Sequence, residues 1–266
     1  MVFPSQVLAL VCSLPRLEDL ELRGKGMDND ADDHTIFQPS TSPPLTGSLT
    51  ISLTEGVEHT ARRLLGLPNG IRLRKLKCTL YSEEDLRWTT ALVEASSDTL
   101  ESIETEDATC GELRPFSLPY GINTWFGAGS TLDDSWATSI DLVKATKLRR
   151  VAFWTYDLFF AWVTMALETI STDHRGLREV SIYTLFHSLS IDDLSNPSQI
   201  IEESCRRCAD LDRVLVKLAE SHVVRVKVVY SSGGGTEELR TCLKALLPGI
   251  TMRVGTELMD VASLYC

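Results

Sequence analysis

The stretch that decides the fold is Leu73-Arg-Lys-Leu76-Lys-Cys78, in which apolar residues stand at the first, fourth and sixth positions. On a β-strand, Leu76 and Cys78 point to one face and Lys77 points to the other, because successive side chains alternate. Related L-x-x-L-x-L patterns occur at Leu17–Leu22, Leu100–Thr105, Leu148–Phe153 and Leu177–Ile182. The pattern therefore predicts a series of short strands that each present one apolar face.

The spacing of these patterns indicates a repeat. They start at residues 17, 73, 100, 148 and 177, so the gaps are 56, 27, 48 and 29 residues. Leucine-rich repeats are about 20–29 residues long, which makes 27 and 29 single periods. A weaker pattern at Thr46–Ile51 divides the first gap, and a degraded one is expected near residues 118–126 in the 48-residue gap. Val223–Tyr230 continues the series as a final strand.

Helical patterns separate the predicted strands. They cover Val57–Leu67, a segment that Ser82 opens as N-cap, Leu158–Ile170, Pro197–Leu218 and Glu237–Leu247. Strands that alternate with helices predict a parallel sheet with crossover helices, an arrangement shared by closed barrels and doubly wound sheets. The near-constant period favours an irregular α/β leucine-rich-repeat solenoid, with a curved parallel sheet and helices on its convex side. We expect a single domain over residues 1–266, with insertions at about 24–44 and 107–138.

Composition narrows the classes of partner. The 266 residues hold 26 basic and 37 acidic side chains, a net charge of −11, which disfavours binding to nucleic acid or to an anionic membrane. Seven cysteines are scattered along the chain, as is typical of reduced thiols in a cytoplasmic or nuclear protein. The most apolar window, Leu158–Ile170, is shorter than the ~20 residues of a membrane-spanning helix.

Several motifs imitate known sites incompletely. The turn at Gly233–Gly235 follows a strand and opens a helix, but it matches neither a dinucleotide nor a P-loop fingerprint. Cys205 and Cys208 form one C-x-x-C without the second pair that a zinc site needs, and Asp28–Asp33 lacks two defining residues of a calcium loop. The five histidines show no ligand or catalytic spacing. We therefore expect no enzyme activity, no catalytic residue, no metal and no cofactor.

The concave face of the predicted sheet is the remaining candidate site. Residues between the apolar positions point away from the core, and their charges alternate in sign. The candidate protein-binding residues are Arg74, Lys75, Lys77, Glu101, Glu104, Arg149, Arg150 and Arg178. If the repeats are in register, Arg74 lies beside Glu101 and Lys77 beside Glu104. The alternative is that these charges only keep the sheet surface solvated.

The strand patterns and one later block resemble a known family. The block comprises Leu177–Tyr183, Cys208–Val216, Glu220–His222 and Lys227–Tyr230. Together they resemble the diverged leucine-rich-repeat region of F-box-like proteins of mushroom-forming fungi, over about Leu14 to Leu247. The resemblance implies a substrate-recognition region whose N-terminal F-box would dock on a ubiquitin-ligase adaptor. No ~40-residue F-box fits before Leu17, so we expect adaptor docking only if an F-box is encoded upstream.

Three functions follow from these observations. The first is a protein-binding scaffold, as the substrate-recognition region of an F-box-type receptor. The second is an α/β enzyme or nucleotide-binding protein that uses the glycine turn at 233–235. The third is a degenerate paralogue or a fragment without activity.

Overall fold

The computed structural model describes residues 18–24, 44–53, 57–67, 69–107, 139–156, 160–186, 200–222, 224–232, 236–253 and 256–260. The strands are β1 Asp19–Gly24, β2 Leu45–Leu53, β3 Ile71–Leu80, β4 Ser102–Asp107, β5 Arg150–Tyr156, β6 Glu179–Phe186, β7 Arg225–Ser232 and β8 Thr256–Asp260. The helices are α2 Val57–Leu65, α3 Glu83–Ala95, α4 Ala161–Glu168, α5 Ile200–Ser221, α6 Thr236–Leu246 and α7 Pro248–Thr251. Both expected insertions, at about 24–44 and 107–138, fall almost wholly outside the described residues.

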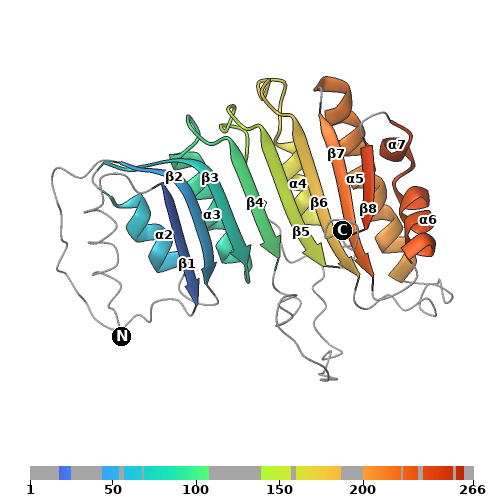
Figure 1. The fold of residues 1–266 in the computed structure, drawn as a ribbon, viewed down its shortest axis with the longest axis horizontal. Coiled ribbons are helices and arrows are strands. Elements are labelled where there is room, and N and C mark those ends of the chain that lie inside the picture. The colour runs from blue at the N-terminus through green and yellow to red at the C-terminus, as the bar shows by residue number, and fades with distance from the viewer. Residues whose placement is uncertain are drawn as a thin grey trace.

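The eight strands form one open, fully parallel sheet in chain order, from β1 at one edge to β8 at the other. Helices α2, α3, α4 and α5 lie behind the sheet in Figure 1, and α6 and α7 pack against α5 at the β8 end. Parallel neighbours need a crossover connection, and the described helices supply it between β2 and β3, β3 and β4, β5 and β6, β6 and β7, and β7 and β8. The chain is thus an α/β protein with a single open parallel sheet. We call the sheet face opposite α2–α5 the open face.

The predicted register is confirmed in the strand pairing. Leu76 of β3 pairs with Leu49 of β2 and with Ile103 of β4, so equivalent positions of three repeats stand side by side. The same row continues through Val151 and Val180. All five side chains are buried. Side chains alternate along a strand, so equivalent positions of strands in register all face the helices.

The core lies between the sheet and the helices. Leu73, Leu100, Leu148 and Leu177, the first residues of four repeats, are each at most 2% exposed. Phe153 of β5 meets Trp162 of α4 edge to face, with ring centroids 5.3 Å apart, and this contact ties a strand to its crossover helix.

Helix α3 begins as its sequence predicts. The Ser82 side chain accepts a hydrogen bond from the backbone N–H of Asp85, and the Asp85 carboxylate accepts bonds from the backbone N–H groups of Ser82 and Tyr81. This capping box satisfies donors that the first helical turn leaves unpaired. Burial raises the pKa of Asp85 above its usual value, although these hydrogen bonds oppose the shift.

Two expectations need correction. Ile103 of β4 pairs directly with Val151 of β5, so no strand lies between β4 and β5 in the sheet. The degraded strand pattern expected near residues 118–126 therefore does not form a strand at that position. Residues 118–126 themselves lie outside the described residues. The second correction is that Val223–Tyr230 does not hold the final strand, because β8 follows it. The five residues of β8 lack the leucine pattern, and they come shortly after α7 in the chain.

Buried polar side chains join the turns that precede successive strands. The Ser96 hydroxyl accepts the Leu73 N–H at 3.2 Å, and the Thr99 hydroxyl donates to the Leu73 carbonyl at 2.9 Å. Two repeats on, Nε2 of the fully buried His174 donates to the Leu142 carbonyl at 2.9 Å. We call these residues the turn ladder. It pairs backbone groups that an apolar core would leave unsatisfied, and it holds the edge of the sheet where the strands begin.

Candidate protein-binding surface

The eight predicted residues lie along the open face and at the edge where its strands begin. Lys75 and Arg150 occupy one row across the strands, and Lys77 and Glu104 occupy the next row. Arg74, Glu101, Arg149 and Arg178 lie at the strand starts, where backbone bonds join Glu101 to Arg74 and Arg178 to Arg149. The register thus brings Lys75, Lys77, Glu104 and Arg150 together on the open face, and the other four residues lie toward the edge where the strands begin.

Two ion pairs confirm the predicted register of charges. The guanidinium of Arg74 lies 3.0 Å from a carboxylate oxygen of Glu101, and Lys77 Nζ lies 2.6 Å from Glu104 Oε1. The Arg74 side chain is 66% exposed, so water and salt screen its pair, and we expect it to contribute only a few tenths of a kcal/mol. These ion pairs are therefore evidence for the register of the strands more than a source of stability.

A second charged group lies farther along the sheet. Glu179 of β6 faces Arg150 of β5 at 3.2 Å and Lys227 of β7 at 3.4 Å, and it accepts a hydrogen bond from the Ser181 hydroxyl at 3.1 Å. Burial opposes the charged form of Glu179, but Lys227, the Ser181 hydroxyl and Arg150 outweigh it and lower the pKa of the carboxyl. Glu179 therefore stays ionised between two basic strands.

The open face also carries an aromatic pair that was not predicted from the sequence. Trp154 of β5 and Tyr183 of β6 stack with ring centroids 4.0 Å apart and planes 7° apart. The indole N–H of Trp154 donates to Glu104 at 3.1 Å, so the aromatic pair is joined to the Lys77–Glu104 pair. The alternation contained the signal, since each aromatic follows the last apolar position of its repeat and must face outward.

The neighbours of the aromatic pair are unusual for a sheet surface. Ala152 and Ser181, which the pattern places on the open face, are at most 1% exposed. Each is a short side chain flanked along its strand by two long ones, which leaves little room for water. Glu106, which pairs in register with Trp154, has a pKa raised by burial, with Lys77 opposing the shift and Glu104 adding to it.

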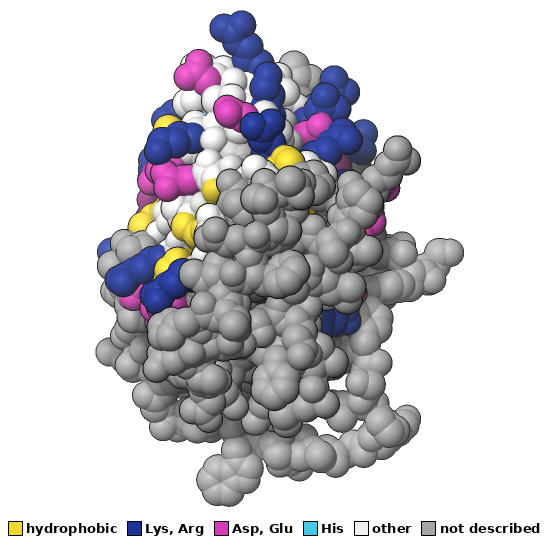
Figure 2. Space-filling view, turned by 90° about the vertical axis from the view of Figure 1, so that its left-hand side faces the viewer, with side chains coloured by type: hydrophobic (Ala, Val, Ile, Leu, Met, Phe, Trp, Pro, Cys, Tyr) yellow, Lys and Arg dark blue, Asp and Glu magenta, His cyan; other side chains and the backbone are white. Residues whose placement is uncertain are grey.

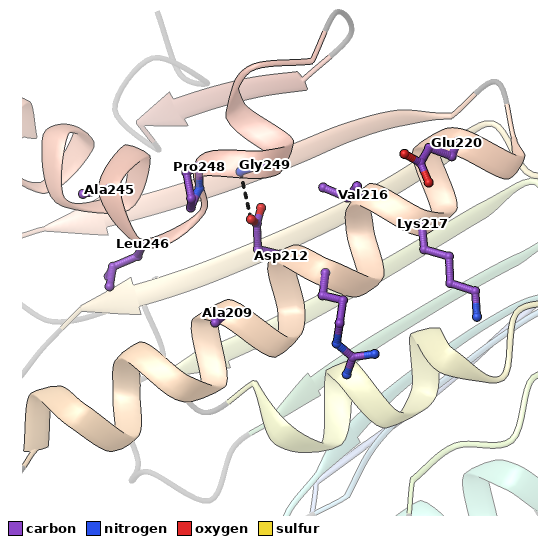
Figure 3. Close-up of a pocket in the computed structure, with 10 residues that line it drawn as sticks. Ala209, Asp212, Val216, Lys217, Glu220, Ala245, Leu246, Pro248 and Gly249 are labelled. Carbon is purple, nitrogen blue, oxygen red and sulfur yellow. Dashed lines mark hydrogen bonds between the residues drawn. The ribbon is translucent and has the colours of Figure 1, made fainter.

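A separate groove of about 660 Å³ opens between α5 and the α6–α7 segment (Figure 3). It is lined by Ala209, Asp212, Arg213, Val216, Lys217, Glu220, Ala245, Leu246, Pro248 and Gly249. The Asp212 carboxylate accepts the N–H groups of Gly249 and Ile250, both at 2.8 Å, and so holds the start of α7. A Cβ on Gly249 would lie 2.7 Å from Asp212 Oδ2, so a larger residue there would have to displace the Asp212 carboxylate. The buried carboxylate in the lining of this groove, that of Asp212, thus has a structural role.

The incomplete motifs gain no support from the fold. Cys208 is buried, while the Cys205 side chain, Gly233–Gly235 and Asp28–Asp33 fall outside what the structure describes. His174 belongs to the turn ladder and His222 binds the Ser171 carbonyl through Nε2. Within the described ranges, no group of three or more His, Cys, Asp or Glu side chains is arranged to hold a metal ion. None of the helices described there is long and apolar enough to cross a membrane.

Comparison with known proteins adds no assignment: no family profile matches the chain, and no curated protein or solved structure is significantly similar to it.

Proposed function

We propose that this chain is a protein-binding scaffold of the leucine-rich-repeat type that uses the open face of its sheet. The observation that carries the proposal is the in-register surface on which the Trp154–Tyr183 stack lies close to the Lys77–Glu104 and Arg150–Glu179 ion pairs. Helices α2–α5 all cover the other face, so the open face has no helix on it among the described residues.

The residue types on this surface suit protein recognition. Tryptophan, tyrosine and arginine are the side chains most enriched among residues that dominate binding energies at protein interfaces. Charged rows beside an aromatic centre would give register and orientation to a partner, because like charges brought together cost several kcal/mol. The stacked pair would be the centre of the contact, and Lys75, Arg150 and Glu104 would be its rim.

Within this proposal, the chain serves as the substrate-recognition region of an F-box-type ubiquitin-ligase receptor in the cytoplasm or nucleus. This part rests on the resemblance to the fungal F-box-like family. Docking on a ligase adaptor would require an F-box encoded upstream of the repeats.

A photo-cross-linking experiment tests the binding surface. A benzophenone amino acid placed at Tyr183 should capture a defined protein in cell extract, whereas one placed at Arg87, exposed on α3, should not capture it. Trp154→Ala should reduce capture at Tyr183, and the thermal midpoint of each variant would show that it is folded. Capture of the same proteins from both positions would contradict the assignment of the open face as the binding surface.

A second experiment tests the ubiquitin-ligase role. The captured protein should be ubiquitinated faster when the full receptor, including any upstream F-box, is added to a reconstituted ligase. A captured protein whose ubiquitination does not change would leave a binding scaffold without a ligase function.

A further inference from the structure

The turns before β4, β5 and β6 leave a groove at the edge where these strands begin. Its volume is about 530 Å³. We call it the turn-edge groove, and it is lined by Arg74, Asp98, Thr99, Glu101, Thr146, Lys147, Arg149, Asp173, Arg175 and Gly176. The strands begin at the upper edge of the sheet in Figure 1, and the turn ladder joins β3 to the turn before β4 and the turn before β5 to the turn before β6.

Unpaired cations concentrate at this edge. Lys147, Arg149 and Arg175 are exposed, and none has an ion-pair partner among the described residues. Arg74 is the fourth cation of the lining and is already paired with Glu101. Lys and Arg side chains also predominate at the top of the molecule in Figure 2, which keeps the vertical direction of Figure 1.

The distribution of charge along the sheet is asymmetric. The first three outward residues at the start of β1, Glu18, Asp19 and Glu21, are acidic, although Arg23 follows them and pairs with Glu21. The equivalent positions at the starts of β3 and β5 are Arg74-Lys75 and Arg149-Arg150. A basic edge is unexpected in a chain whose net charge is −11, because scattered charge would make most of its surface acidic. The lining also holds three acidic residues, Asp98, Glu101 and Asp173, so its four cations exceed its carboxylates by one.

We propose that the turn-edge groove binds an acidic peptide segment of the partner protein, a segment with carboxylates at alternate positions. This inference deepens the proposed scaffold function and rests on it. From β3 to β6 the sheet spans three strand spacings, roughly 14 Å. An extended segment of about five residues covers that length, and its alternate side chains point to the same side. Carboxylates at alternate positions along that length would face the cations of the lining, which are Arg74 on β3, Lys147 and Arg149 before β5, and Arg175 before β6.

Two backbone groups complete the site. The N–H groups of Lys147 and Gly176 precede the first leucines of two successive repeats, and neither has a hydrogen-bond partner among the described residues. A carboxylate can accept such donors together with a guanidinium, and charge-assisted hydrogen bonds of this kind are the stronger ones.

Fluorescence anisotropy with a labelled Gly-Glu-Ser-Glu-Ser-Glu-Gly peptide tests the proposal. The peptide should bind at 50 mM salt and bind several-fold more weakly at 200 mM, because salt screens exposed charges. A peptide with Gln in place of each Glu should not bind. The double variant Arg149→Glu/Arg175→Glu should weaken binding at least tenfold, and Arg149→Gln/Arg175→Gln should weaken it by a smaller factor.

The matched control is Arg63→Glu/Arg87→Glu, which changes the net charge equally through exposed residues of α2 and α3. It should change the affinity by less than twofold. Equal losses in both double variants, binding of the Gln peptide, or equally tight binding of a DNA duplex would overturn the proposal. If peptide binding fails while capture at Tyr183 persists, the groove is refuted and the open-face scaffold stands; loss of capture alone would refute the scaffold.

Discussion

Replacing His174 by Ala should destabilise the protein by about 3 kcal/mol. The His174 side chain is fully buried, its Nε2 donates to the Leu142 carbonyl, and its Nδ1 accepts the Ser171 N–H at 3.1 Å. Without the ring, the carbonyl of the buried Leu142 loses its partner, which costs ~1–3 kcal/mol. The Ser171 N–H lies in a half-buried residue that water can reach, so its lost bond should cost ~0.5–1.5 kcal/mol.

Urea and thermal unfolding measure this loss. At ~2–4 °C per kcal/mol for a protein of this size, the melting temperature should fall by about 6–12 °C. His174→Gln should recover part of the loss, because its amide N–H can still donate to Leu142. His222→Ala is the matched control, since His222 is half-buried and binds one carbonyl, that of Ser171, at 3.1 Å.

Two outcomes would show that the turn ladder contributes little to the free energy of unfolding. One is a cost below about 1 kcal/mol for His174→Ala. The other is an equal cost for the two histidine replacements. Either result would mean that water or a rearranged turn replaces the ring, and the turn-edge groove would then lack the rigid support that we infer for it.

Four further predictions concern the charges, the Cys78 thiol and the glycine turn. Arg74→Glu or Glu101→Arg alone should destabilise by a few tenths of a kcal/mol, and the exchange of both should be milder than either, as a double-mutant cycle in urea would show. The lowered pKa of Glu179 means that its ionised form stabilises the fold above pH ~4.5 and that this contribution disappears as the pH falls through the folded-state pKa. The stability difference between the wild type and Glu179→Gln should therefore shrink below pH 4.5, and a constant difference would contradict this. Burial raises the pKa of the Cys78 thiol to about 12, so a thiol reagent at pH 8 should modify Cys78 only after unfolding. Saturating ATP should leave the melting temperature unchanged, whereas a rise would revive the nucleotide-binding alternative for the glycine turn.

Much of the architecture could be predicted because strand periodicity is a local property. A residue two positions from Leu76 must share its face, so the leucine pattern alone predicted the buried row and the Arg74–Glu101 and Lys77–Glu104 pairs. The Ser82 cap was predictable for the same reason, since its partner Asp85 lies in the same helical turn. Predicting the Trp154–Tyr183 pair required extending the alternation by one residue beyond the leucine pattern of each repeat.

Features that join distant segments could not be predicted in this way. The direct pairing of β4 with β5 depends on which strand edges meet after the insertion, and no local pattern records that choice. The turn-edge groove gathers residues from Arg74 to Gly176, and His174 finds the Leu142 carbonyl across 32 positions of the chain. The sequence by itself determined which face of each strand is buried, because side-chain alternation is built into the backbone. Only the tertiary structure decided which turns adjoin and which cations stay unpaired, because those depend on contacts that form when the repeats stack.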